Sequence, residues 1–247
     1  MEKIRLQKWL ADLGLCSRRE AERWMLQDRL KINGKLARPG DHVCHEHDKV
    51  ELDGEVLGTK QPPKVYWLFN KPDKFLTSHR REDDKERIYD LPNLSQLSFR
   101  IFPVGRLDYR TEGLLLLTND GELSYRLCHP KFKQPRKYQV LINGKLTKAQ
   151  LSALRKGITL DDGPVRCEIG HAQGVNLGKT KGCWYLITVW EGRNRLVRRI
   201  FESMDLKVVR LIRYGFGDLR LTDQVQPGSY RQLSQKEIQY LKKSVRL

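Results

Sequence analysis

The sequence predicts an α+β protein with a small N-terminal unit of helices and hairpins, followed by a larger domain with a mainly antiparallel central sheet flanked by helices. Short strand-forming runs separated by turn residues recur along the chain, and capped helices are scattered between them. A polar stretch with two prolines at residues 61–64 reads as a linker. We therefore expect the small unit at residues 1–60 and the larger domain at residues 65–247.

Two helices and several short strands account for the first sixty residues. Apolar residues at helical spacing over residues 3–13, followed by Gly14, predict the first helix. Ser17 and Glu20 have the spacing of a capping box and open the second helix. Strands are predicted in a hairpin with an Asn-Gly turn and in a second pair that closes the unit, over residues 30–32, 35–36, 42–43 and 49–52.

The larger domain is predicted to hold more strands than helices. The strands are expected around residues 65–70, 100–104, 114–118, 136–140 and 184–190. The helices are expected over residues 121–127, 148–156, 194–204 and 234–243. A charged loop is expected over residues 79–86.

The charge of the chain points to a polyanionic partner. The 247 residues contain 47 Lys and Arg against 30 Asp and Glu, which gives a net charge of +17, and 39% hydrophobic residues are enough for a proper core. Almost all of this excess, +16, falls in residues 61–247. Nucleic acid is the favoured partner. Since no apolar run reaches membrane-spanning length and no signal-peptide core opens the chain, we expect no membrane association and a cytoplasmic location.

The cysteines and histidines do not predict a disulfide framework or a metal site. The five cysteines are widely spaced and never form a C-x-x-C pair, so we expect reduced thiols. His42, Cys44, His45 and His47 form the one cluster of metal-ligand types. In the extended segment expected there, residues 42 and 44 face away from residues 45 and 47, so we expect no metal.

Asp108 stands in a turn between two predicted strands. It ends the segment Gly105-Arg106-Leu107-Asp108, and a run of four leucines follows a few residues later. A lone aspartate in such a place most often caps the turn, although functional residues also concentrate in loops. Its role depends on what the rest of the chain supplies.

The first sixty residues resemble the S4 RNA-binding domain. The resemblance rests on the order of a helix, a Ser-Arg-Arg-Glu helix, a strand with Asn-Gly-Lys and a Pro-Gly-Asp turn. In that family the second helix and the hairpin present basic side chains to structured RNA. The corresponding RNA-binding residues here are Arg18, Arg19, Arg23, Arg29, Lys31 and Lys35. Their effect is cumulative, because each neutralised phosphate adds to the affinity.

The rest of the chain resembles the pseudouridine synthases, and within them the ribosomal RNA enzymes with an N-terminal S4 domain, the RsuA and RluB group. The segments at residues 120–130 and 157–164 resemble the RluB-like enzymes of the large ribosomal subunit more than the small-subunit enzymes. The matching segments, in order, are residues 102–108, 112–121, 137–138, 191–195, 197–199 and 210–228. Each motif alone is weak, but their order and spacing are specific.

The resemblance implies a role for several residues. Asp108 is the catalytic nucleophile, which attacks a flipped-out uridine at C6 of the base or C1′ of the ribose. Tyr138 stacks on the extruded base, and Arg198 pairs with Asp108. Val197 forms an apolar wall, and Arg106 holds the displaced nucleotide or its phosphate.

A basic helix start contributes further substrate-binding residues. Apolar side chains anchor one face of the helix predicted over residues 194–204, which leaves Arg195 and Arg199 able to face the RNA. The reaction is an isomerisation and needs no cofactor. The expected partner is ribosomal RNA or a pre-ribosomal particle, bound by a monomer without a protein partner.

Two other functions remain to be weighed. An S4-containing RNA methyltransferase would need a glycine-rich loop between a strand and a helix, which the sequence lacks. A non-catalytic RNA-binding or ribosome-assembly protein needs only the S4 domain and the charge. The favoured hypothesis is an enzyme that converts a specific uridine of 23S ribosomal RNA to pseudouridine, with a 16S target as the alternative.

Overall fold

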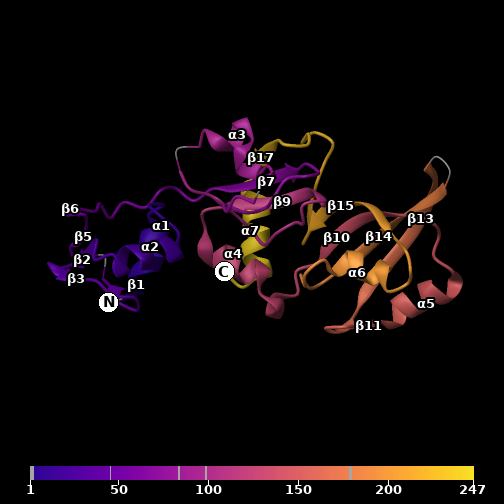
Figure 1. Ribbon diagram of the computed structural model, residues 1–247, viewed down its shortest axis with the longest axis horizontal. Coiled ribbons are helices and arrows are strands. Elements are labelled where there is room, and N and C mark those ends of the chain that lie inside the picture. Colours follow the sequence, from indigo (N-terminus) through magenta and orange to yellow (C-terminus); the bar gives the residue numbers. More distant parts are fainter. Residues whose placement is uncertain (1–2, 45, 83, 98, 178–179) are drawn as a thin grey trace. The chain divides into compact units, whose positions relative to one another are not determined.

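The computed structural model describes residues 3–44, 46–82, 84–97, 99–177 and 180–247 (Figure 1). The chain divides into two compact units. The N-terminal unit comprises Met1–Val65, Ser98–Ile101 and Asn119–Gly121. The C-terminal unit comprises Tyr66–Leu97, Phe102–Thr118 and Glu122–Leu247.

The N-terminal unit packs two helices, α1 (Leu6–Asp12) and α2 (Arg18–Leu26), with short strands. Ser17 caps α2 as predicted, since its Oγ accepts a hydrogen bond from the Glu20 amide at 3.0 Å. The strands are β1 (Ile4–Arg5), β2 (Leu30–Ile32), β3 (Lys35–Leu36), β4 (His42–Val43), β5 (Val50–Leu52) and β6 (Glu55–Val56). A core that includes Trp9, Leu10 and Met25 holds the helices together.

The predicted strand pair over residues 42–43 and 49–52 is wrong. β4 pairs with β1, and β5 lies between β2 and β6 in a four-stranded sheet of order β3-β2-β5-β6. The first helix is correspondingly shorter than expected, because Ile4 and Arg5 are used in the strand that pairs with β4.

A turn after β4 also corrects the geometry expected for the histidine cluster. The amides of His47 and Asp48 both donate to the Cys44 carbonyl, at 3.0 and 2.8 Å, so the segment is not extended. As a result Cys44, Glu46 and His47 offer ligand atoms within 4.8 Å of one another. Glu46 and His47 are exposed neighbours in sequence, and His45 lies outside the described residues. All five cysteines are free thiols.

The C-terminal unit is organised around a mainly antiparallel sheet, to which nine strands of the described chain belong. Its main path runs β13-β14-β10-β15-β9-β7-β17, with β8 on β9 and β16 on β15. The strands are β7 (Tyr66–Lys71), β8 (Phe102–Pro103), β9 (Glu112–Thr118), β10 (Arg136–Ile142), β13 (Cys167–Leu177), β14 (Thr180–Val189), β15 (Val208–Phe216), β16 (Leu219–Arg220) and β17 (Tyr230–Gln232). A separate pair is formed by β11 (Ile158–Leu160) and β12 (Gly163–Val165).

One parallel pair interrupts the antiparallel pattern. β15 runs parallel to β9, and Arg213 lies opposite Gly113 in their register. Gly113 has φ +100°, and a Cβ atom there would lie 2.4 Å from the Arg213 carbonyl oxygen. Only glycine therefore allows the two strands to approach this closely.

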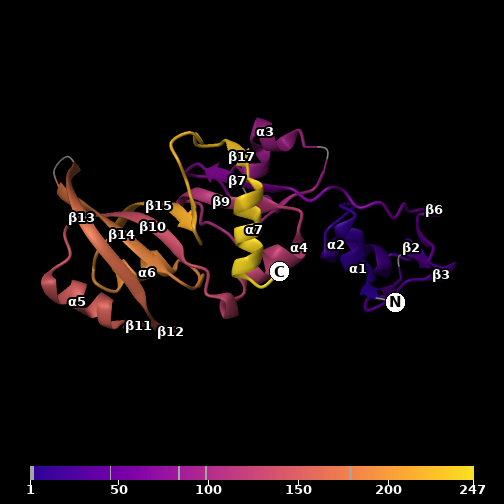
Figure 2. The ribbon, with the colours of Figure 1, turned by 180° about the vertical axis from the view of Figure 1, so that it is seen from behind.

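Helices cover the sheet near the positions that the sequence predicts. They are α3 (Pro92–Ser95), α4 (Gly121–Cys128), α5 (Lys148–Lys156), α6 (Leu196–Glu202) and α7 (Gln235–Ser244), with short 3₁₀ turns η1 (Ile88–Asp90) and η2 (Pro130–Phe132). Figures 1 and 2 both show α4 and α7 side by side next to β9. Arg126 of α4 joins them through Nη1, which donates to the carbonyls of Val245 and Arg246.

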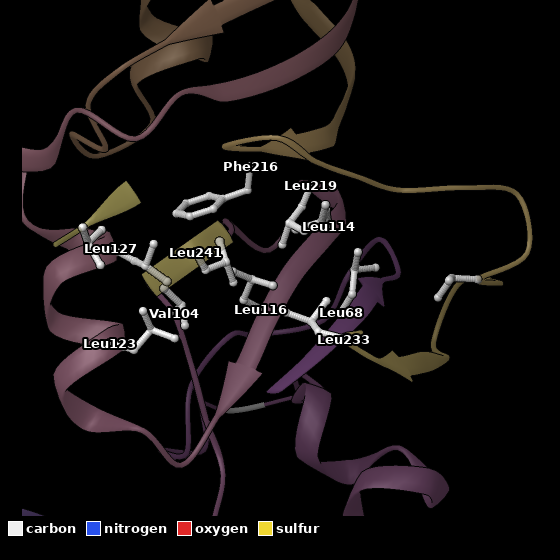
Figure 3. Packing of buried hydrophobic residues seen from close by; sticks show 12 residues of the cluster. Leu68, Val104, Leu114, Leu116, Leu123, Leu127, Phe216, Leu219, Leu233 and Leu241 are labelled. Carbon is white, nitrogen blue, oxygen red and sulfur yellow. The ribbon is translucent and has the colours of Figure 1, made fainter. Parts of the chain in front are cut away.

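One hydrophobic core of this unit lies between these two helices and the sheet. This cluster of buried residues joins Leu123 and Leu127 of α4, Leu241 of α7, and Leu114 and Leu116 of β9 (Figure 3). The alternate residues of the strand, Leu115 and Leu117, are buried as well, so β9 is covered on both faces. This rigid strand begins immediately after the turn that carries Asp108.

A search for transmembrane segments found no helix of sufficient length and apolar character among the described residues.

Candidate active site

A cleft of about 260 Å³ opens in the C-terminal unit beside Asp108. It is bounded by the turn between β8 and β9, by β10 and β15, by the loop after β14 and by the start of α6. Its lining includes Arg106, Asp108, Thr111, Arg136, Tyr138, Glu191, Arg193, Arg195, Val197 and Arg213. Segments that lie far apart in the sequence therefore meet in a cleft lined by two carboxylates and five arginines.

The backbone around Asp108 is held at every carbonyl. In the aspartate loop, residues 107–111, all five carbonyl oxygens accept hydrogen bonds. The Thr77 hydroxyl donates to the Leu107 carbonyl, and the Thr111 amide donates to the Asp108 carbonyl. The Lys71 ammonium donates to the carbonyls of Tyr109 and Thr111, and the Lys74 amide also donates to that of Tyr109. The Arg198 guanidinium donates to the Arg110 carbonyl. The half-buried Asp108 side chain is therefore presented by a backbone with little freedom to move.

Lys71, at the end of β7, is the least expected of these donors. Its side chain is fully buried, and its Nζ lies 2.9 Å from the Thr111 carbonyl, 3.3 Å from that of Tyr109 and 3.0 Å from that of Pro72. Burial lowers the pKa of Lys71 to about 8, against the attraction of Asp73, Glu112 and Asp108. The ammonium thus supports the loop and adds positive charge beneath Asp108.

Tyr138 lies in β10 with 8% of its surface exposed and lines the cleft. The neighbouring strands place Ile187 and Arg213 opposite it in register. The structure thus brings Asp108 and Tyr138 into one cleft, as their predicted roles require. Val197, at 5% exposed, lines the cleft at the start of α6.

Arg198 contacts the backbone of the aspartate loop. Its Nη2 donates to the Arg110 carbonyl at 2.7 Å and its Nη1 to the Val208 carbonyl at 3.2 Å. Among the described residues, no ion pair within 4 Å joins Arg198 to Asp108; its Nε is buried without a hydrogen-bond partner. Burial lowers the pKa of this guanidinium, Arg195 adds to the lowering, and the charge of Asp108 acts in the opposite sense.

The remaining predicted substrate-binding arginines differ in position. Arg106 and Arg195 line the cleft, and Arg195 also pairs with Glu202 at 2.9 Å. Arg199 is not among the residues of the cleft, because its guanidinium pairs with Asp161 and Asp162. The structure therefore brings Arg106 and Arg195 to the site and leaves Arg199 outside it.

The predicted RNA-binding side chains of the N-terminal unit are exposed. Three of them lie on α2, one on β2 and one on β3, namely Arg18, Arg19, Arg23, Lys31 and Lys35. Arg23 pairs with Glu20 at 3.1 Å, and Arg29 pairs with Asp53. Exposed cations of this kind remain available to phosphates.

Sequence reasoning assigned no role to four residues that the structure places at or beneath the site. Lys71, Arg136 and Arg213 are buried cations, and a buried cation cannot be told from a surface one by sequence pattern alone. Thr111 lines the cleft with a buried hydroxyl that has no hydrogen-bond partner among the described residues. Its place three residues after Asp108 was the one available signal.

The comparisons with known proteins agree on the kind of protein. Residues 65–203 match the model of the family described as RNA pseudouridylate synthase, and residues 4–50 match the S4 domain. A protein of Aquifex aeolicus named "Uncharacterized RNA pseudouridine synthase" is 40% identical over 100% of this chain and 97% of its own length. "Ribosomal large subunit pseudouridine synthase B" of Pseudomonas aeruginosa is 39% identical over 98% of this chain, which spans 63% of that relative.

A solved structure extends the agreement to the fold. "Crystal structure of pseudouridylate synthase" superposes with a TM-score of 0.63 at 31% identity, over 96% of this chain and 99% of the other. An S4 domain joined to a domain with an arginine-lined carboxylate cleft defines an RNA-modifying isomerase. The chain belongs to the RNA pseudouridylate synthase family, which confirms the resemblance found in the sequence, the S4 domain and the α+β architecture.

Proposed function

We propose that this enzyme converts a specific uridine of large-subunit ribosomal RNA to pseudouridine, with Asp108 as the nucleophile. One observation carries the proposal: Asp108 faces a cleft shared with Tyr138 and Val197, on a loop whose five carbonyls are all hydrogen-bonded. A nucleophile needs such fixed placement, since misplacement by about 1 Å can cost a hundredfold in rate.

The proposed reaction leaves the composition of the RNA unchanged. The Asp108 carboxylate attacks C6 of the base or C1′ of the ribose, and the bond between N1 and C1′ breaks. The base then turns and C5 bonds to C1′, and the bond to Asp108 breaks, which regenerates the free carboxylate. C5 loses a proton and N1 gains one. The uridine must first leave its stack, because neither atom is open to attack inside folded RNA.

The surrounding side chains suit these steps. The Tyr138 ring offers an aromatic face for the extruded base, and Val197 an apolar wall. Arg106 is exposed at the cleft and is placed to hold the RNA backbone. Arg198 keeps the aspartate loop in position, and we propose that it pairs with Asp108 once RNA closes the site. Arg195 adds positive charge to the cleft. Arg199 would contact RNA only if its ion pairs with Asp161 and Asp162 broke.

The large-subunit target is supported by the relatives. The Pseudomonas aeruginosa protein carries that substrate in its name, and so do relatives from Yersinia pestis and Vibrio cholerae at 37% and 36% identity. We propose that residues 1–60 act as the S4 module, that residues 61–64 link it to the catalytic domain at 65–247, and that a monomer works on the RNA or a pre-ribosomal particle in the cytoplasm.

The deciding experiment maps pseudouridines in the ribosomal RNA of cells that lack the protein. One site should become uridine in 23S RNA, and wild-type protein should restore it. Asp108→Asn, which keeps the shape but removes the nucleophile, should not restore it while still binding the RNA. Restoration by Asp108→Asn would refute the role of Asp108.

The same maps distinguish the alternatives. A lost site in 16S RNA would assign the small subunit as the target. If no site is lost, although the protein still binds ribosomal RNA, the non-catalytic RNA-binding function replaces the proposed one.

A further inference from the structure

A second cavity, of about 330 Å³, adjoins the cleft that holds Asp108. The two share Gly105, Arg106 and Gly192 among their walls. The second cavity alone reaches apolar side chains away from Asp108, namely Val104, Cys128, Pro130 and Phe216. Arg136 and Arg213 line both cavities, and we call the second one the arginine pocket.

Arg136 and Arg213 are buried cations with no charged partner. They are 9% and 2% exposed, and among the described residues neither forms an ion pair with a carboxylate. Arg136 donates to the Gln134 carbonyl and Arg213 donates to the Leu114 carbonyl, but Nη2 of Arg213 is buried without a partner. Burial lowers the pKa of Arg136, and Arg213 adds to the lowering. Glu191 also lines the pocket and its charge acts on Arg136, but its carboxylate pairs with Arg193. Two buried cations without an ion-pair partner of their own are costly unless a further anion joins them.

Other arginines that line the cleft do have carboxylate partners, unlike Arg136 and Arg213. Arg193 pairs with Asp162 and Glu191, and Arg195 pairs with Glu202. The charges of Arg193 and Arg195 are therefore balanced by ordinary structural ion pairs. Arg136 and Arg213, which are more deeply buried, have only carbonyl oxygens to bind.

An irregularity of the sheet brings the two side chains together. Arg136 lies opposite Phe216 and Tyr138 lies opposite Arg213, with a register shift between Lys137 and Tyr138. In a regular strand, residues 213 and 216 would face opposite sides of the sheet. The bulge places both on the face of Arg136, and the two guanidinium carbons lie 5.6 Å from the Phe216 ring centroid.

We propose that the arginine pocket binds the phosphodiester group of a nucleotide next to the target uridine. This inference rests on the proposed function, since it places a flipped uridine in the adjoining cleft. A phosphate supplies the missing negative charge, and the planar guanidinium fork matches its oxygens. Arg106 is exposed and lines both cavities, so it is available to either site.

The test uses the full-length enzyme and a synthetic RNA that contains the uridine identified by mapping. Single methylphosphonates, which remove one phosphate charge each, replace successive linkages around that uridine. With wild-type enzyme, one linkage next to the uridine should weaken binding about 10- to 100-fold. Arg136→Gln should bind the unmodified RNA as weakly and lose its response to that methylphosphonate. It should also lower the slope of log affinity against log salt by about 0.7 to 1.

Matched variants guard against misfolding and general charge loss. Arg136→Lys keeps a charge in the pocket if Arg136→Gln fails to fold, and it should retain a partial methylphosphonate response. Arg166→Gln removes an exposed arginine of the same unit outside both cavities and should respond like wild type.

Two failures have different signatures. If Arg136→Gln responds to every methylphosphonate as wild type does, while pseudouridine still forms, the phosphate site is refuted alone. If wild-type enzyme forms no pseudouridine in the RNA, the proposed function itself fails, and the inference fails with it.

Discussion

Nη2 of Arg198 donates a hydrogen bond of 2.7 Å to the carbonyl oxygen of Arg110, 88 residues away in the chain. The contact ties the start of α6 to the aspartate loop two residues beyond Asp108. The arginine that the sequence predicts to pair with Asp108 thus contacts the backbone that presents this carboxylate, rather than the carboxylate itself.

Arg198→Lys should lower kcat more than it raises KM. Lysine keeps the charge but cannot reach the Arg110 and Val208 carbonyls together, so the aspartate loop loses a support. Loss of a charged hydrogen bond worth roughly 1.5–3 kcal/mol implies a kcat reduced about 10- to 100-fold. Steady-state kinetics on the ribosomal RNA substrate would measure both constants. Arg166→Lys is the matched control, and an unchanged kcat in Arg198→Lys would contradict the role.

Lys71→Met should change how stability depends on pH. Because the pKa of Lys71 falls from 10.5 to about 8 on folding, the unfolded chain binds more protons between these values. Wild-type stability should therefore rise with pH across this window by roughly 3 kcal/mol relative to the variant, and the cost of the buried charge is fully present below pH 8. Urea unfolding from pH 7 to 10.5 would measure the difference. Lys236→Met, at an exposed lysine, should run parallel to wild type, and parallel curves for Lys71→Met would disprove the shift.

Gly113→Ala should destabilise the C-terminal unit. The new Cβ would lie 2.4 Å from the Arg213 carbonyl oxygen, at a φ of +100° that alanine rarely adopts. We expect a loss of about 2 kcal/mol or more in the free energy of unfolding, from strain and from separation of β9 and β15. Gly228→Ala has a similar φ of +82° with no atom within 4 Å of its Cβ, and should cost only about 1 kcal/mol. Thermal unfolding of both variants separates the clash from the strain; equal losses would refute the close approach.

Neutralising the S4 surface should weaken RNA binding and leave catalysis intact. Arg19→Gln/Lys31→Gln removes two exposed cations of the N-terminal unit, so the affinity should fall and the salt slope should drop by about 1.4 to 2. The kcat at saturating RNA should stay at the wild-type value. Lys236→Gln/Lys243→Gln removes the same charge from α7 and serves as the control. An equal loss of affinity in both double variants would argue against a specific S4 surface.

The sequence predicts the fold class and most helices because caps and apolar spacing are local signals. Ser17 and Ser234, for example, cap helices where expected. It misses β15, in which Arg210 and Arg213 obscure the alternation and a bulge shifts its phase. Charged residues that become buried, such as Lys71, carry no local mark of their burial.

The sequence likewise predicts only part of the candidate site. Asp108, Tyr138 and Val197 belong to motifs with a recognisable order, and the structure places them in one cleft. The partners of arginines depend on contacts between distant segments. Arg199 therefore differs from its expected place, because Asp161 and Asp162 lie within its reach after folding. Arg136 emerges only when the register of β10 and β15 is known.

The aspartate loop is held by hydrogen bonds to its backbone carbonyl oxygens, which every amino acid possesses. Since its hydrogen bonds end on carbonyl oxygens, the side chains at positions 109 and 110 can be exchanged without removing any acceptor. Substitutions at these two positions would then change the side chains next to Asp108 in the loop while the Asp108 carboxylate stays where it is. Such a loop allows one chemistry to be inherited unchanged as the RNA that reaches it diversifies.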